Sequence, residues 1–168
     1  MESQGMLEIN GWKFFFHSCF LEQLVALVST VQTLKKSAPI GYKKKAPTKL
    51  LAAINKVITE RIAVNPLDPI FYQGNTLGTK HKHWFRAKFL QQFRLFFRCS
   101  EKDKIIIISW VNDFSTLRSY SSKNDAYQVF ASMLSPPDDW ETLSQEAKMA
   151  TKAVDPNSAI GFLLKNNN

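Results

Sequence analysis

The stretch that decides the fold spans residues 84–110 and reads WFRAKFLQQFRLFFRCSEKDKIIIISW. Its first two-thirds largely alternate between apolar and basic side chains, which is the two-residue period of a strand. The run Ile105–Ile108 is continuously apolar and favours a central strand that is buried on both faces. Three strands joined by short turns are therefore expected, over 84–89, 93–99 and 104–110.

The segments on either side add helices to these strands. Residues 12–16 are aromatic and predict another strand. Apolar side chains then recur at helical spacing over 20–34 and over 51–62, which predicts a two-helix hairpin. A further helix is expected after residue 124 or 125, and a short one around Trp140. The order of strand, two helices, three antiparallel strands and helices is an α+β layout.

Length and composition fit one folded domain. The chain has 168 residues, 45% of them apolar, which is enough for a core without disulfides. We expect a single domain over 1–150 and a loosely ordered tail over 151–168. The two cysteines are far apart in the sequence, which favours a reducing compartment. We find neither a signal peptide nor an apolar run of membrane-spanning length, and therefore expect a cytoplasmic protein with no membrane partner.

The net charge of +8 is concentrated in the middle of the chain. Residues 35–61 carry eight basic residues and one acid, and residues 76–118 carry nine basic residues and three acids. Clustered cations of this kind favour a phosphate-bearing partner, because each phosphate contact releases counterions.

One face of the first two strands of the stretch is expected to be basic and aromatic, because every second residue of a strand shares a face. With the strands in register, this face gathers Trp84, Arg86, Lys88, Arg94, Phe96 and Arg98. Burying such cations without partners is costly, so we expect the face to be exposed or to meet phosphate. It is either an ordinary solvated face or an RNA-binding surface on which Trp84 and Phe96 stack against bases.

The polar segment that leaves the third strand carries two more candidates. The guanidinium of Arg118 is a fixed fork of donors, suited to charge that develops on a phosphate. Tyr120 can stack on a base or donate a proton. The alternative is a local turn in which Asp113 pairs with Arg118.

Two further groups of basic residues are candidates for RNA contacts. His81 and His83 stand beside the basic face, where a histidine can act as an acid or base. As metal ligands they lack a third partner, so we expect no metal. Three consecutive lysines, Lys43, Lys44 and Lys45, precede a helix N-terminus, where the helix dipole disfavours cations. They indicate either a binding site for an external anion or an ordinary solvated run of charge. The sequence contains no cofactor-binding motif, and no cofactor is expected.

Short strings in collinear order over residues 10–145 resemble a known family. They are Asn10-Gly11-Trp12, Lys49-Leu50-Leu51, Val64-Asn65-Pro66, Phe93-Arg94-Leu95-Phe96-Phe97-Arg98, Trp110-Val111-Asn112-Asp113, Thr116-Leu117-Arg118, Asp125-Ala126-Tyr127 and Asp139-Trp140-Glu141-Thr142-Leu143. The sequence is similar in these strings to the YhaV toxin family, within the RelE-like group. The resemblance implies a cytoplasmic ribonuclease that cuts messenger RNA on the ribosome. It also implies a PrlF-like antitoxin with a swapped-hairpin DNA-binding domain, through which alone the complex would bind operator DNA.

The resemblance further implies a RelE-like fold, in which an N-terminal strand and a two-helix hairpin pack on an antiparallel sheet with C-terminal helices. It assigns the catalytic positions to Arg86, Lys88, Arg94, Arg118 and Tyr120, with Tyr127 as a competing candidate for the aromatic role. The implied reaction is metal-independent attack of a ribose 2′-OH on its own 3′-phosphate. Two alternatives stay open, a non-catalytic RNA-binding module and a ParE-like protein that binds DNA gyrase.

Overall fold

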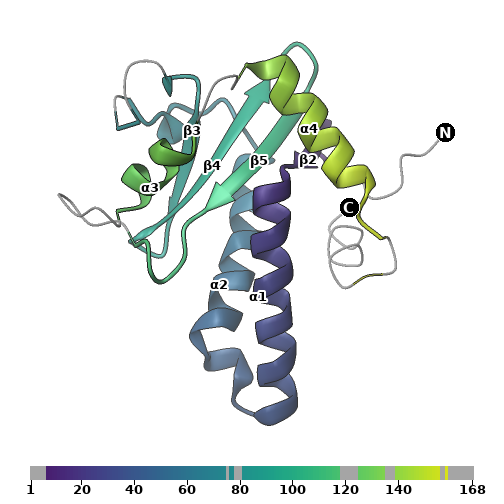
Figure 1. The fold of residues 1–168 in the computed structure, drawn as a ribbon, viewed down its shortest axis with the longest axis vertical. Coiled ribbons are helices and arrows are strands. Elements are labelled where there is room, and N and C mark those ends of the chain that lie inside the picture. The colour runs from purple at the N-terminus through teal and green to yellow at the C-terminus, as the bar shows by residue number, and fades with distance from the viewer. Residues whose placement is uncertain are drawn as a thin grey trace.

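A computed structural model describes residues 7–74, 76–77, 81–117, 125–134, 139–155 and 158 (Figure 1). It is an α+β fold built on a five-stranded mixed sheet with the strand order β1-β2-β5-β4-β3. The strands are β1 (Leu7–Ile9), β2 (Trp12–Phe16), β3 (Phe85–Phe89), β4 (Phe93–Ser100) and β5 (Ile105–Val111). The three strands expected from residues 84–110 are confirmed to within one residue at each end.

The central strand is β5, all of whose residues are buried, as its apolar run predicted. It pairs antiparallel with β4 but parallel with β2. The expectation of an antiparallel sheet is therefore wrong for this pair. Parallel neighbours need a long crossover connection, and the helices and strands between β2 and β5 supply it.

The first strand was not expected from the sequence. It is only three residues long and pairs antiparallel with β2. The turn between them is Asn10-Gly11, and both residues have positive φ, 54° and 82°. An Asn-Gly pair with this backbone is the strongest short-range signal of a tight hairpin, so the dipeptide itself marked the missed strand.

Two helices follow β2 and form a long hairpin that projects from one end of the sheet (Figure 1). They are α1 (Ser18–Ser37) and α2 (Ala46–Lys56), and a π-helical segment, Val57–Ile62, continues α2. The N-cap of α1 is His17, whose Nδ1 atom accepts the backbone N–H of Cys19 at 3.4 Å. Between the helices lies a short 3₁₀ turn, Tyr42–Lys44.

The sheet carries a separate apolar cluster on each face. The α1–α2 hairpin covers one face, where its side chains pack on Phe14, Phe16, Leu95, Phe97, Ile106 and Ile108. The other face is covered by α3 (Ala126–Met133) and α4 (Trp140–Lys152), which pack on Phe15, Phe96, Ile105, Ile107 and Trp110. Each fully buried side chain of this size contributes about 1.5–3 kcal/mol to folding.

The last described helix is tied to the start of the sheet. The backbone N–H of Phe16 donates to Thr151 Oγ1 at 2.8 Å, and His17 Nε2 lies 2.9 Å from a carboxylate oxygen of Glu146. The helix α4 continues to Lys152. Most of the tail predicted over 151–168 lies outside the described residues, so the predicted domain boundary stays a prediction. No helix in the described ranges is long and apolar enough to cross a membrane.

Candidate active site

The register of the β3–β4 hairpin places the predicted basic residues on one face. Arg86 lies opposite Phe96, and Lys88 lies opposite Arg94. Side chains directly opposite each other in an antiparallel pair point to the same side of the sheet. The shared face that the sequence predicted is therefore confirmed.

The same face is not open to solvent in the way we expected, because α3 covers much of it. The ring of Phe130 stacks on Phe96 at 4.3 Å and meets the edge of Trp84 at 5.2 Å. Trp84 is 1% exposed and Phe96 is fully buried. The expectation that these two rings are exposed for base stacking is wrong, since an aromatic side chain of α3 packs against both of them.

Two arginines on this face are buried and converge on one oxygen atom. Arg86 Nε donates to the hydroxyl oxygen of Tyr127 at 2.8 Å, and Arg94 Nε donates to the same atom at 3.3 Å. Arg86 Nη1 also donates to the carbonyl of Ile70, and Arg94 Nη1 to the carbonyls of Gln91 and Phe93. Arg86 is only 9% exposed and Arg94 only 6%. The phenol of α3 thus fixes the positions of two cations that come from different strands.

The charge of this arginine pair is not balanced within the part of the chain that the structure describes. No carboxylate there forms an ion pair with either guanidinium, whose acceptors are a phenol and backbone carbonyls. Neutral acceptors satisfy the N–H groups but leave two positive charges close together. An anion such as phosphate would compensate them with charge-assisted hydrogen bonds.

Lys88 marks the solvent side of the pair. Its side chain is exposed, and its strand position is directly opposite Arg94. Its backbone carbonyl accepts a hydrogen bond from Arg61 Nη1 at 2.6 Å, which ties the end of β3 to the π-helical segment.

Asn112 holds the backbone of Arg94, although the sequence analysis assigned no role to this residue. Its Oδ1 accepts the backbone N–H of Arg94 at 2.7 Å, and its Nδ2 donates to the carbonyls of Gln92 and Thr116. Asn112 is 1% exposed. Its position in the sequence could have indicated this role, since a side-chain amide directly after a buried strand needs hydrogen-bond partners inside the protein.

The turn that follows Asn112 is held by Asp113. Burial raises the pKa of this carboxyl, but hydrogen bonds from Ser115 and Thr116 outweigh burial and hold the pKa below its ordinary value. Arg118 and Tyr120 lie outside the described residues, so the predicted pairing of Asp113 with Arg118 stays a prediction. Tyr127, the competing aromatic candidate, is the tyrosine that contacts both arginines.

The remaining predicted site residues lie in three places. The rings of His81 and His83 are 6.3 Å apart, just before β3. The guanidinium of Arg98 lies over the rings of Trp84 and Trp140, 5.5 and 5.6 Å from their centroids. Three exposed lysines lie at the tip of the α1–α2 hairpin, remote from the sheet (Figure 1): Lys43, Lys44 and Lys45. No group of three or more metal-ligating side chains occurs among the described residues.

The fold and the site define a basic α+β protein with two buried arginines that share one phenol acceptor. A family model for YhaV toxins, described as "Toxin with endonuclease activity, of toxin-antitoxin system", matches residues 14–148. The chain belongs to this family, as its sequence resemblance implied, and the family description makes it an endonuclease toxin with a cognate antitoxin.

Curated relatives agree with the family assignment. The chain is 52% identical over 145 residues to a protein named Ribonuclease toxin YhaV from Escherichia coli K12, covering 83% of this chain and 94% of the relative. The same identity and coverage are found for Toxin YhaV of Escherichia coli O157:H7. No solved structure matches the chain.

Proposed function

We propose that this chain is a ribosome-dependent endoribonuclease that cleaves messenger RNA and thereby stops translation. The observation that carries the proposal is the convergence of Arg86 and Arg94 on one phenol oxygen with no paired carboxylate among the described residues. A scissile phosphate supplies the missing negative charge. The family description and the name of the 52% identical relative support a nuclease.

The proposed reaction needs no metal. The 2′-OH of one ribose attacks its own 3′-phosphate, the P–O bond to the next nucleotide breaks, and the products are a 2′,3′-cyclic phosphate and a free 5′-OH. One proton leaves the attacking hydroxyl and one reaches the departing oxygen. The reaction therefore requires a base, an acid and cations around the phosphorane.

The residues of the basic face fit these roles. Arg94 stabilises charge on the non-bridging oxygens together with Arg86, and Arg118 adds a third guanidinium. Each well-placed donor of this kind is worth about 3–4 kcal/mol in the transition state. Lys88 is the exposed candidate for the base, and His81 or Tyr120 for the acid. Tyr127 positions the two buried guanidiniums.

The fold is proposed to be RelE-like, with the active face on the β3–β4 hairpin. The partners are messenger RNA, the ribosome and a PrlF-like antitoxin, and operator DNA is bound through the antitoxin alone. The exposed lysines Lys43, Lys44 and Lys45 are proposed to contact RNA phosphates away from the active face. A cytoplasmic location follows from these partners.

Of the alternatives, non-catalytic RNA binding loses its main support. It relied on Trp84 and Phe96 as stacking surfaces, and both rings are buried under α3. A ParE-like role in gyrase binding gives no reason for two buried arginines that pair with no carboxylate among the described residues.

The test uses purified protein, translating ribosomes and an end-labelled message. We expect cleavage that leaves 2′,3′-cyclic phosphate and 5′-OH ends. A matched message with a single 2′-deoxynucleotide at the cleavage position should resist cleavage, because the attacking hydroxyl is missing. Cleavage of the deoxy message at the same position would show that water attacks instead and would overturn the mechanism.

A further inference from the structure

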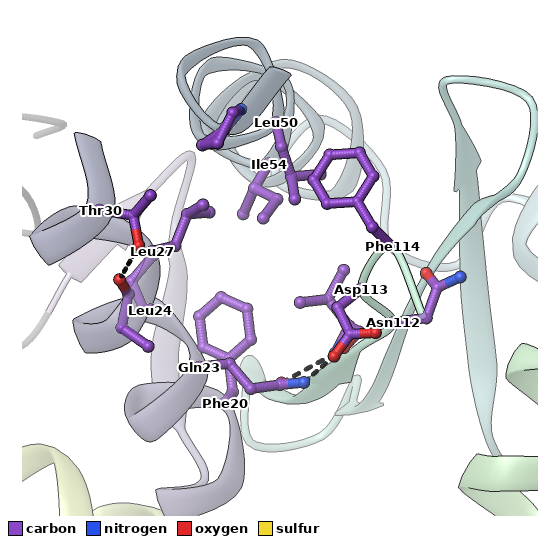
Figure 2. A pocket seen from close by; sticks show the side chains of 13 residues that line it. Phe20, Gln23, Leu24, Leu27, Thr30, Leu50, Ile54, Asn112, Asp113 and Phe114 are labelled. Carbon is purple, nitrogen blue, oxygen red and sulfur yellow. Dashed lines mark hydrogen bonds between the residues drawn. The ribbon is translucent and has the colours of Figure 1, made fainter. Parts of the chain in front are cut away.

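A groove on the face of the sheet that the α1–α2 hairpin covers is separate from the basic face. It has a volume of about 340 Å³ and lies between α1, α2 and the segment that leaves β5. Figure 2 shows side chains from these three elements arranged around a common hollow. Its apolar wall is formed by Phe20, Leu24, Leu27, Leu50, Ile54 and Phe114.

The polar groups at the end of this groove are already used. Gln23 Nε2 donates to the carbonyl of Val111, and Gln23 Oε1 accepts the backbone N–H of the same residue. The carboxylate of Asp113 accepts from Ser115 and Thr116. The remaining wall is mainly carbon, so the groove favours apolar side chains over the phosphates and polar edges of RNA.

The surroundings of the groove decide the charge of its partner. Between Glu22 and Glu60 the sequence has seven lysines and no acid. Two of them, Lys45 and Lys49, flank Pro47, which lines the groove. A second copy of this chain would bring the same positive charge to the hairpin, so the charge disfavours a homodimer and favours an acidic partner.

We propose that this groove is the docking site of an apolar, acid-flanked segment of the cognate antitoxin. The proposal rests on the role of the chain as the toxin of a toxin–antitoxin pair. An amphipathic helix that presents apolar side chains at i, i+3 or i+4 and i+7 fills a groove between two helices, and its acidic face then meets the lysines of the hairpin. The volume lies at the lower end of the usual range for binding pockets, which fits a few inserted side chains.

The groove adjoins the support of the active face without including Arg86, Lys88 or Arg94. Phe114 at its rim packs edge-on against Phe93 with ring centroids 5.3 Å apart. Asn112 belongs to its lining and holds the backbone of Arg94. A docked segment therefore presses on residues that position the active site, from the opposite side of the sheet.

Two neighbouring residues of α1 provide a matched test. Ala26 and Val25 are both exposed, but only Ala26 lines the groove. The probe is the full-length cognate antitoxin, titrated against purified toxin by calorimetry without RNA. We expect Ala26→Glu to weaken binding about tenfold or more, because a carboxylate then enters an apolar contact, and Val25→Glu to change it less than about twofold.

Three further readouts keep the result interpretable. Both variants should keep the thermal midpoint and the message cleavage of the wild type, which separates antitoxin binding from the nuclease proposal. Lys49→Glu should weaken antitoxin binding and reduce its salt dependence. Equal antitoxin affinity for Ala26→Glu and wild type, or equal losses in the two glutamate variants, would overturn the docking proposal. Loss of binding to a labelled RNA by Ala26→Glu, with antitoxin binding intact, would overturn it in favour of an RNA surface.

Discussion

Replacing Tyr127 by phenylalanine tests the arginine pair directly. The change removes one oxygen and keeps the ring, whose edge-to-face contact with Phe96 at 5.5 Å holds α3 on the sheet. Arg86 Nε and Arg94 Nε both lose their acceptor. A buried donor without a partner costs about 1–3 kcal/mol, so two of them cost about 2–6 kcal/mol.

The small residual exposure of both arginines places the expected loss in the lower part of that range. Water reaches the guanidiniums to a limited extent, and we expect the free energy of unfolding to fall by about 2–3 kcal/mol. With a urea m-value of about 2 kcal/mol/M, the midpoint of unfolding should fall by about 1–1.5 M. Message cleavage should fall as well, because the two cations lose their common anchor.

The assay is urea unfolding followed by tryptophan fluorescence, with Tyr72→Phe as the control. Tyr72 also stacks on a phenylalanine, Phe85 at 5.6 Å, but is 54% exposed, so removing its hydroxyl should leave the midpoint unchanged. Inorganic phosphate should restore more stability to Tyr127→Phe than to Tyr72→Phe. Equal midpoints for the two variants would refute the reasoning that the phenol holds buried charge.

Three other predictions concern different parts of the chain. Changing Lys43, Lys44 and Lys45 together to alanine should weaken binding to ribosomes and make this binding less dependent on salt. Single-turnover cleavage of bound message should stay near the wild-type rate. An unchanged salt dependence would show that these lysines do not contact RNA. Because the pKa of Asp113 is lowered in the folded state, its hydrogen bonds stabilise the protein above pH 3.8, and this stabilisation is lost as the pH falls further. The free energy of unfolding of Asp113→Asn should lack this part of the pH dependence. A pH profile identical to that of the wild type would show that Asp113 does not stabilise the folded state in this way. Cys99 is half-buried, and this burial, followed by the nearby Glu101, raises the pKa of its thiol to about 11. Iodoacetamide should therefore label Cys99 slowly at pH 8 and faster with each pH unit up to that value, and rapid labelling at pH 8 would contradict the raised pKa.

Local sequence patterns were sufficient for the elements but not for all of their contacts. The alternation over 84–99 placed Arg86, Lys88 and Arg94 on one face, because side-chain direction in a strand depends only on position along the strand. The isoleucine run predicted the central strand for the same kind of reason. The parallel pairing of β2 with β5 joins residues about 90 positions apart, and no local pattern encodes it.

The cover over the basic face was the main feature that could not be predicted. The sequence indicated a helix after residue 124 but not which side of the sheet it would cover. Because Phe130 of that helix stacks on Phe96, the face is dry where a stacking surface was expected. Sequence spacing alone could not favour Tyr127 over Tyr120 for the aromatic role at the site. The contact that favours Tyr127 joins its hydroxyl to Arg86, which is 41 residues away in the sequence.

Asn112 touches two surfaces at once, the floor of the apolar groove and the backbone of Arg94. Two ligands that act on one shared group are thermodynamically linked, and their coupling free energy is the same in both directions. If the proposed antitoxin segment rests against this amide and Arg94 holds an RNA phosphate, each ligand would change the dissociation constant of the other by an equal factor.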